Sequence, residues 1–342
     1  MRLHDFDYDL PGHLIAQTPS INREDSRLMV LFREEEKIIH SQFKYLSEFV
    51  NQNEIIVLNE SKVIPARLFG HKQKTGARIE ILISRPLDEK AGIYKVLAKP
   101  MKRISCGTHI EFATGFEMEV LEKNNEFCTI KFNNPEKFEW FLNRYGKTPL
   151  PPYITKRNPD DKDRYQTIFA RIPGSVAAPT AGLHFTVQLF NELENKNITI
   201  AKVILHVGPG TFMPLREEKI ENQSLEEEEY SLPEETANKI NNTRQAGNAL
   251  IAVGTTTTRV LESCADIHGK VEGNAGLTSA FIYPGYKFRV VDKIITNFHL
   301  PRSSLLLLVC AFAGKDFILN AYKAAISMGY RFYSYGDAML IR

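Results

Sequence analysis

The hydrophobic patterning of this chain changes along its length, and that change limits the folds it can adopt. Between residues 77 and 132, short runs of alternating polar and apolar residues are separated by turn signals such as 123–125. Runs of this length and spacing are typical of a small antiparallel sheet or barrel. Outside this block, an apolar stretch at 55–58 predicts a buried strand, and after residue 185 strands and helices alternate, which predicts an α/β domain with a mostly parallel sheet.

The alternating part can be divided into expected elements. The expected strands are 198–207, 249–253 and 293–296, and the expected helices begin after Thr186, after Ser231, after 254–258, at 303 and at 316. Thr186 has the residue type of a helix N-cap. Ser231 and Glu234 have the spacing of a capping box, with Pro233 in the first turn.

These patterns predict a larger mixed α/β domain interrupted by a small antiparallel β-barrel domain. We assign residues 1–64 and 150–342 to the discontinuous α/β domain and residues 65–149 to the inserted barrel, and the length of 342 residues fits two domains. Within the insert, a helix is expected from Pro135 to Gly146. The following segment, rich in proline and charge up to Tyr165, is predicted to be a linker.

Composition excludes several classes of protein. The net charge is +2, so the chain is not a general nucleic-acid coat, although local basic patches remain compatible with it. The four cysteines are far apart, which disfavours a disulfide framework or a metal cluster and fits a reducing cytoplasm. The longest apolar run, 305–313, is too short to span a bilayer and predicts a buried helix. We therefore expect a cytoplasmic protein with no metal and no membrane contact.

Four segments combine small or flexible residues with groups that can bind a ligand. One is PGSVAAPTAGLHFT at 173–186, and the others, at 206–212, 254–259 and 296–304, each follow an expected strand. In open α/β sheets, ligands bind at the carboxyl ends of strands. Glycine allows a ligand close to the backbone, and threonine, asparagine and histidine supply hydrogen bonds.

Each segment also has a purely structural interpretation. His184 and His206 could be satisfied core histidines, Gly254 with Thr255 could form a turn and helix cap, and Ser303 could start a helix. The 254–259 segment lacks the lysine and spacing of a phosphate-binding P-loop.

Charged and aromatic runs leave alternatives open as well. The glutamates at 226–229 are by default a solvated acidic face. The basic spans 61–79 and 153–171 suit contact with one phosphate-rich partner, but ordinary surface has the same composition. The aromatic residues at 330–335 could pack in the core or stack on bases.

Taken together, long stretches of the chain resemble one enzyme family. The matching stretches are FDYDLPGHLIAQTP, VLNESKVIPARL, LPPYI, RYQTIFA, GSVAAPTAGLHF, HVGPGTF, GTTTTRVLES, FIYPGYKF, ITNFHLPRSSLLLLVCAFAG and YRFYSYGDAMLI, in order from residue 6 to 341. The family is that of the S-adenosylmethionine:tRNA ribosyltransferase-isomerases of queuosine biosynthesis. GSVAAPTAGLHF and TNFHLPRSSLLLLVCAF are long enough to be specific, whereas GTTTTR alone is not.

The resemblance implies a reaction and its partners. Such an enzyme transfers the ribosyl unit of S-adenosylmethionine onto 7-aminomethyl-7-deazaguanine at the wobble position of tRNA. The products are epoxyqueuosine, adenine and methionine, so S-adenosylmethionine is a consumed substrate and no separate cofactor is expected. The implied fold, an α/β domain with an inserted barrel, agrees with the patterning. We expect a monomer whose partners are tRNA, through its anticodon loop, and S-adenosylmethionine.

The resemblance also directs attention to particular residues. Deprotonation beside a sulfonium, departure of adenine and loss of an amine proton all need acid–base groups near neutral pKa. The catalytic candidates are His184, His206, His299 and Glu228, the last as a carboxylate partner for the amine or ribose. The substrate-binding candidates are Arg164, Gln166, Thr167, Ser175, Ala178, Pro179, Thr180, Gly182, Gly208, Gly210, Thr211, Phe212, Gly254, Thr255, Thr256, Arg259, Asn297 and Ser303.

The chain departs from the family pattern at two places. Where the family has His-x-Met-His-x-Glu, this chain keeps Glu228 but has Gln223 and Glu226 in place of the histidines, and Leu277 replaces the usual tryptophan. A degenerate homologue that binds tRNA without turnover is therefore the alternative hypothesis. A methyltransferase is disfavoured, because 55–63 lacks the expected glycine-rich loop.

Overall fold

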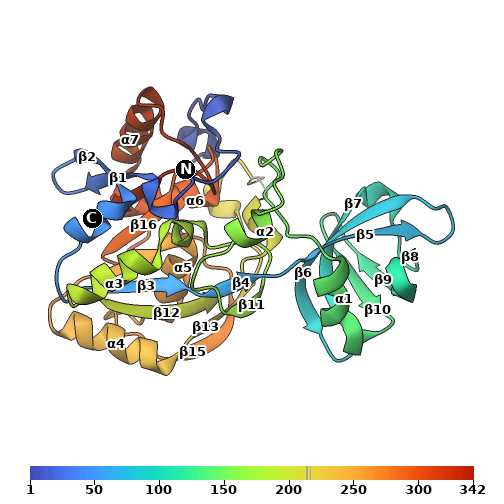
Figure 1. Ribbon diagram of the computed structural model, residues 1–342. Coiled ribbons are helices and arrows are strands. Elements are labelled where there is room, and N and C mark those ends of the chain that lie inside the picture. The colour runs from blue at the N-terminus through green and yellow to red at the C-terminus, as the bar shows by residue number, and fades with distance from the viewer. Residues whose placement is uncertain (213–214, 216) are drawn as a thin grey trace.

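The computed structural model, which describes residues 1–212, 215 and 217–342, consists of a large α/β body and a smaller β-barrel beside it (Figure 1). The two chain ends both lie in the body, and the barrel is inserted between β4 and the segment that leads back to α2 (Figure 1). The predicted fold class is therefore confirmed.

A nine-stranded sheet forms the centre of the body. Its strands, in spatial order, are β15 (Asn274–Thr278), β13 (Glu228–Leu232), β12 (Thr199–Leu205), β3 (Ile55–Asn59), β14 (Leu250–Val253), β16 (Lys293–Asn297), β17 (Ala338–Ile341), β1 (Arg27–Phe32) and β2 (Lys37–Gln42). The four strands β12, β3, β14 and β16 run parallel. Antiparallel pairs flank them on both sides, so the sheet is more mixed than the expected mostly parallel one.

The body helices cover both faces of this sheet. They are α2 (Asp161–Arg164), α3 (Val187–Asn195), α4 (Glu234–Gln245), α5 (Gly254–Cys264), α6 (Ser304–Ala313) and α7 (Lys315–Ser327). Because strand side chains alternate between faces, Ile55 and Val57 join one core with α4 to α7, while Ile56 and Leu58 join the other core with α3. All five residues of β3 are buried, which explains its continuous apolar sequence.

The barrel is closed and antiparallel, with strands in the order β10-β7-β6-β5-β8-β9. Their bounds are β5 (Arg67–Lys72), β6 (Arg78–Asp88), β7 (Ile93–Lys99), β8 (His109–Glu111), β9 (Glu117–Lys123) and β10 (Cys128–Phe132). Alternate residues of each strand point inward and form a separate core, as Ile79, Ile81 and Ile83 of β6 show. Helix α1 (Phe138–Tyr145) buries Phe138, Phe141 and Leu142 against that core.

Two expectations about local structure are wrong. The segment predicted as a linker is packed: Leu150, Ile154 and Tyr165 belong to a buried cluster with residues from other parts of the chain, such as Leu183 and Tyr335. Ser231 does not cap α4, because it lies inside β13, paired with Ile204 of β12; the residue at the N-cap of α4 is Pro233. Long-range strand pairing has overridden a local sequence signal.

Strand β4 (Ser61–Val63) leads from the body into the barrel. It pairs in parallel with β11 (Ile172–Ser175), and this small pair lies on the side of the body that faces the barrel (Figure 1). Helix α6 is mostly buried, as the 305–313 run predicted. Within the described residues, no single helix is long and apolar enough to cross a membrane; α6 and α7 pass that test only as a pair, bent by 115°.

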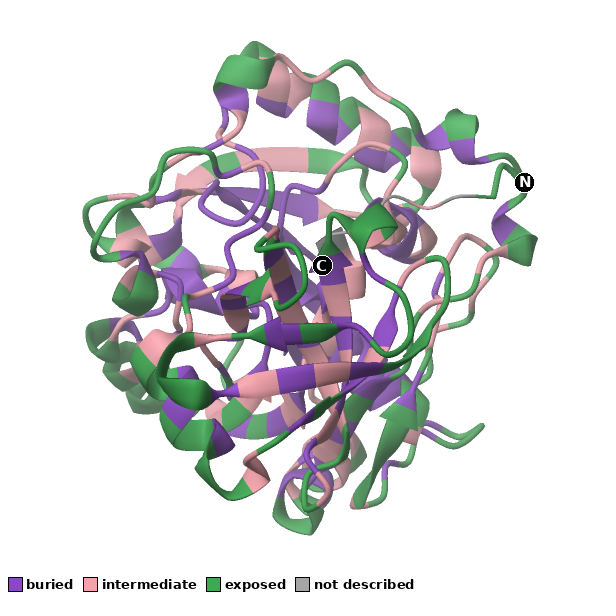
Figure 2. Ribbon diagram, turned by 90° about the vertical axis from the view of Figure 1, so that its right-hand side faces the viewer, coloured by how far each residue is buried: buried purple, intermediate pink, exposed green. Residues whose placement is uncertain are grey.

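Buried residues are concentrated inside the body and the barrel, with exposed ones along the outer loops and helices (Figure 2).

Candidate active site

Three cavities meet at the carboxyl ends of the parallel strands. The inner cavity, of about 80 Å³, lies between the loop after β11 and the ends of β14 and β16. The side cavity, of about 290 Å³, lies between the 222–226 segment, α5 and α6, and the interdomain cavity, of about 800 Å³, lies between barrel and body. Thr211 lines the inner and side cavities, while Gly210, Glu226 and Glu228 line the side and interdomain cavities. Shared lining residues at 210–211, Glu226 and Glu228 therefore connect the three cavities.

Much of the predicted set lines the inner cavity. The predicted residues found there are Ala178, Pro179, Thr180, Thr211, Gly254, Thr255, Thr256, Asn297, His299 and Ser303. They come from four segments that are far apart in the sequence. These are the 173–186 stretch and the three segments that follow expected strands. The N-terminus of α5 begins at Gly254, so the first helical N–H groups also lie at this cavity.

Buried polar atoms in the inner cavity lack partners. Within the described chain, Asn297 Oδ1 and Thr256 Oγ1 have no hydrogen bond, although each atom is shielded from solvent. Buried polar groups in native proteins are nearly always paired, because an unpaired one costs about 1–3 kcal/mol. These two atoms together are the feature expected of a site that a polar ligand completes. Tyr165 also lines the inner cavity. It was not among the predicted site residues, although the stretch RYQTIFA that holds it is one of those that carry the family resemblance.

His299 is fixed against the wall of the inner cavity. Its Nε2 lies 2.8 Å from Thr296 Oγ1, and its backbone N–H donates to the Tyr322 hydroxyl at 2.9 Å. The Tyr8 hydroxyl donates to its carbonyl oxygen. Burial lowers the pKa of His299 to about 3, so the ring is neutral at physiological pH. A neutral, oriented imidazole can exchange a hydrogen bond or a proton with a ligand in the cavity.

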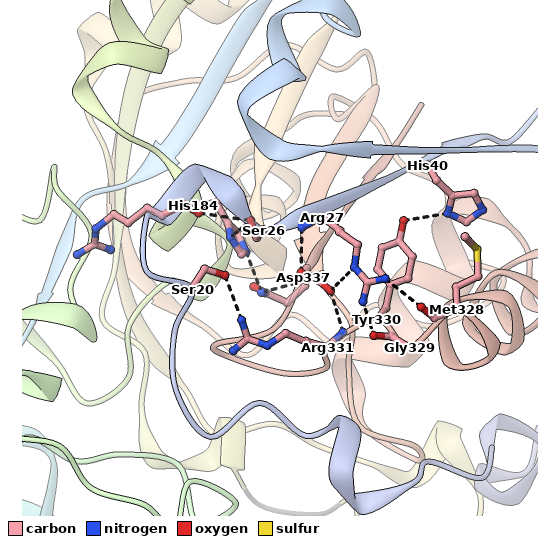
Figure 3. Close-up of polar contacts among 12 residues, drawn as sticks. Ser20, Ser26, Arg27, His40, His184, Met328, Gly329, Tyr330, Arg331 and Asp337 are labelled. Atoms are coloured by element: carbon pink, nitrogen blue, oxygen red, sulfur yellow. Dashed lines mark hydrogen bonds and ion pairs between the residues drawn. The ribbon is translucent and has the colours of Figure 1, made fainter.

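His184 faces away from the inner cavity. It lines a separate small cavity of about 20 Å³ together with Arg23 and Arg164. Its Nδ1 lies 2.7 Å from Ser26 Oγ (Figure 3), and its Nε2 lies 3.1 Å from Asn297 Nδ2. Burial, with Arg23 close by, lowers its pKa to about 3. Both ring nitrogens of His184 have partners, which agrees with the structural interpretation of a satisfied core histidine, and the part of the stretch that lines the inner cavity is 177–181.

His206 lies on the wall of the interdomain cavity. Its ring packs against Gly174, where an added Cβ would come within 2.7 Å of the ring, so this approach requires glycine. Gly174 also has φ of +142°, a conformation that side chains with a Cβ rarely adopt. The Nδ1 atom is buried without a partner among the described residues, and burial lowers the pKa of His206.

Glu228 and Arg259 form a buried ion pair between the side and interdomain cavities. Glu228 accepts a hydrogen bond from Arg259 Nη1 and another from the Gly208 backbone N–H at 2.8 Å. Arg259 Nε donates to the Ala280 carbonyl at 2.9 Å, and its Nη2 has no partner in the described part of the chain. Both side chains are at least nine-tenths buried. The default interpretation of 226–229 as a solvated acidic face is therefore wrong for Glu228.

Two further glutamates of this run form ion pairs with the barrel. Glu226 pairs with Lys95 and Glu227 pairs with Arg85, so both connect the body to barrel strands. Gln223 and Glu226, which occupy the family's histidine positions, both line the side cavity. Leu277 is half exposed on β15.

Several predicted substrate residues are engaged by the protein itself. Gln166 bonds both the N–H and the carbonyl of Val63, and Arg164 donates to the carbonyls of Ser20 and Ile21. Ser175 Oγ joins the Ala177 carbonyl to the Val207 N–H. These residues hold loops in place, and none of the three lines the inner cavity.

Four further predicted residues complete the account. Ser303 caps α6 by accepting from the Leu306 N–H, in agreement with its structural interpretation, and it also lines the inner cavity. Gly182 gives Thr167 and Phe169 room, since an added Cβ would meet both. The side chain of Phe212 lies outside the described part of the structure. Among the described residues, no group of three or more histidine, cysteine or acidic side chains could hold a metal ion.

The chain is similar to known proteins over its whole length. Residues 3–341 match the family described as queuosine biosynthesis protein. Two relatives named S-adenosylmethionine:tRNA ribosyltransferase-isomerase, from Acetivibrio thermocellus and Clostridioides difficile, are 48% and 47% identical, with all of each chain aligned. A solved structure of S-adenosylmethionine tRNA ribosyltransferase from Thermotoga maritima matches with a TM-score of 0.58 and 39% identity, covering 99% of this chain and 100% of that one.

Proposed function

Because the chain belongs to the queuosine biosynthesis protein family, we propose that it is an S-adenosylmethionine:tRNA ribosyltransferase-isomerase. It transfers the ribosyl unit of S-adenosylmethionine to 7-aminomethyl-7-deazaguanine at the tRNA wobble position. Epoxyqueuosine forms, and adenine and methionine leave. The observation that carries this proposal is the junction of three cavities at 210–211, Glu226 and Glu228, since the reaction brings together three chemically distinct parts.

The adenine of S-adenosylmethionine fits the inner cavity. Adenine offers an amino donor and ring-nitrogen acceptors, and the inner cavity supplies Asn297 Oδ1, Thr256 Oγ1 and the neutral imidazole of His299. The small residues at 178 and 179 leave space beside the backbone. When adenine departs, it needs a hydrogen bond or proton at its leaving nitrogen, and His299 is the residue we assign to that role.

The amino-acid part fits the side cavity. Arg259 lines that cavity, and its Nη2 is buried without a partner among the described residues, so it matches an incoming carboxylate. Leu215, Phe281 and Leu308 give the same cavity apolar walls for the methylene chain. This placement leaves the sulfonium and ribose near Thr211, where the inner and side cavities meet.

The wobble base reaches this junction from the interdomain cavity, which is large enough for a nucleotide. Its aminomethyl group is an ammonium in water, and the Glu228 carboxylate, held by Arg259 and Gly208, attracts it to the junction. The amine must lose a proton before it attacks the ribosyl carbon. His206, neutral because its pKa is lowered, accepts that proton in our assignment.

A single chain holds all three cavities, which supports a monomer as the working unit. A cytoplasmic location follows from the proposed tRNA substrate, and the described cysteines are all free, in keeping with a reducing compartment. S-adenosylmethionine is consumed in the reaction, and no separate cofactor is part of the proposal.

The test is a product assay. The protein is incubated with S-adenosylmethionine and tRNA that carries the aminomethyl base, and released adenine and methionine are measured with epoxyqueuosine in the tRNA. We expect His206→Ala and His299→Ala to lose activity at least a hundredfold, the range of one acid–base group. His109→Ala, an exposed barrel histidine, serves as the control and should be fully active. Binding of tRNA without adenine release, or release of S-adenosylhomocysteine, would contradict the proposal.

A further inference from the structure

One outer face of the barrel carries a cluster of cations around a single aromatic ring. The ring is Phe69 of β5, which is partly buried. The guanidinium carbons of Arg67 and Arg78 lie 5.4 and 4.5 Å from its centroid, and Lys147 Nζ lies 5.5 Å from it. All three distances are within the range of a cation–π contact, so the ring holds three positive charges in one place.

Strand pairing explains why these side chains share a face. Phe69 and Arg67 alternate with the inward Leu68, and Arg78 stands on β6 opposite His71. Lys147 follows α1 and is bridged to Arg67 through the backbone. We call Arg67, Phe69, Arg78 and Lys147 the barrel patch.

The barrel patch has more positive than negative charge. Arg67 forms an ion pair with Glu80 at 2.8 Å, but within the described residues no carboxylate forms an ion pair with Arg78 or Lys147, which are both exposed. Arg157 from the body adds a fourth cation: its pKa is lowered by partial burial and by the nearby Arg67. On a chain with a net charge of only +2, this is a concentrated positive region.

The barrel patch also adjoins the interdomain cavity. Pro65, two residues before Arg67, lines that cavity, and so does Asn143, four residues before Lys147. The two chain segments meet there, since Gly146 packs directly on the Pro65 carbonyl. A polynucleotide whose base enters the cavity therefore has its backbone close to these cations.

We propose that the barrel patch binds the phosphate backbone of the tRNA next to the nucleotide held in the interdomain cavity. The inference rests on the proposed function for the identity of the RNA. Positive charges that neutralise phosphates supply sequence-independent affinity and fix the register of a nucleic acid. Phe69 serves to orient the cations, since its ring already packs against three of them. The barrel is then a substrate-binding unit, with Arg78 and Lys147 as its main contacts.

The experiment compares two charge-reversed proteins of equal net charge. Arg78→Glu/Lys147→Glu reverses two of the three charges of the barrel patch, and Lys131→Glu/Lys137→Glu is the matched control. Lys131 is exposed on β10, three strands from β5 in either direction around the barrel, and Lys137 is exposed in the turn before α1. Binding of the substrate tRNA is measured by fluorescence anisotropy over a range of salt, and adenine release is measured at varied tRNA.

We expect the patch variant to bind tRNA at least tenfold more weakly than the control at about 0.1 M salt. In a plot of the logarithm of the tRNA association constant against the logarithm of the salt concentration, the magnitude of the slope should decrease by about 0.7–0.9 for each lost phosphate contact. Adenine release should show a raised KM for tRNA with little change in kcat, because no barrel-patch residue is among those that line the inner, side or interdomain cavity. Phe69→Leu should weaken binding less, by a few-fold, through lost orientation of the cations.

Equal tRNA affinity in the patch and control variants, with both folded by thermal unfolding, would overturn the proposal. Equal losses in both variants would also overturn it, because they would show only a response to net charge. The binding measurement needs no catalysis. A wild-type protein that binds tRNA through the patch but releases no adenine would thus refute the proposed function while leaving this inference standing.

Discussion

Lowering the pH should destabilise this protein through His184, a residue chosen from the sequence as catalytic and found to be buried and satisfied. In the folded state Asn297 Nδ2 donates to its Nε2, so the ring proton lies on Nδ1, toward Ser26 Oγ. A second proton on Nε2 would point at the donor of Asn297 and be buried away from water. Both effects favour the neutral ring.

The size of the effect follows from the two pKa values of His184. The folded value is about 3 and the unfolded value is about 6.5. Because the folded pKa is depressed, the contribution to stability is fully present above pH 6.5 and is lost as the pH falls toward 3. Each pH unit below the unfolded pKa lowers the free energy of unfolding by about 1.36 kcal/mol. At pH 5, about 1.5 units below 6.5, the free energy of unfolding is therefore lower by about 2 kcal/mol.

The assay is urea unfolding of the wild type and of His184→Gln at pH 8 and pH 5. Glutamine cannot titrate, yet its amide can accept from Asn297 and donate to Ser26. We expect the wild type to lose about 2 kcal/mol more than the variant between these pH values, while His299, present in both, cancels. Equal losses in the two proteins would refute the reasoning. At pH 8 the variant should still release adenine, because His184 lies outside the inner cavity.

Three further results are expected. Arg259→Met should lower the free energy of unfolding, measured in urea, by about 3–5 kcal/mol, because it leaves Glu228 buried without its partner. Adding Glu228→Gln should restore part of this stability. Strictly additive losses in the double variant would contradict the coupling. Gly174→Ala should displace the His206 ring, and this should lower kcat and destabilise the fold by about 1–3 kcal/mol. An unchanged kcat would show that His206 does not take part in the reaction. Thr256→Val should leave the free energy of unfolding equal or higher, because it removes a hydroxyl without a partner among the described residues. It should nevertheless raise the KM for S-adenosylmethionine several-fold. An unchanged KM would exclude Thr256 from the binding site.

The fold was predictable where its signals are local. Alternation with period two is visible in a strand such as 78–84 without knowledge of its partner, and a serine before an apolar run, as at Ser303, marks a helix start. Strand ends could likewise be located, and with them the segments that line the inner cavity. These signals depend on the residues next to one another in the chain.

Side-chain direction was not predictable in the same way. His184 and His299 share a residue type, a matched motif and burial, but only His299 lines the inner cavity. Which way each points depends on contacts with Ser26 and Thr296, and Ser26 is 158 residues from His184 in sequence. Ser231 failed as a helix cap for the same reason, since its pairing with β12 is long-range.

The departure from the family pattern at Glu226 can be judged from its contacts. Glu226 pairs with Lys95 and Glu227 with Arg85, so the acidic residues link body and barrel. These side chains are all at least one-fifth exposed, and such pairs contribute about 0–1 kcal/mol each, too little to fix the barrel by themselves. The substitution therefore acts mainly on the charge of the side and interdomain cavities that Glu226 lines. An added carboxylate close to Glu228 favours a cationic amine, which is the charge of the incoming aminomethyl group, so the change is compatible with turnover.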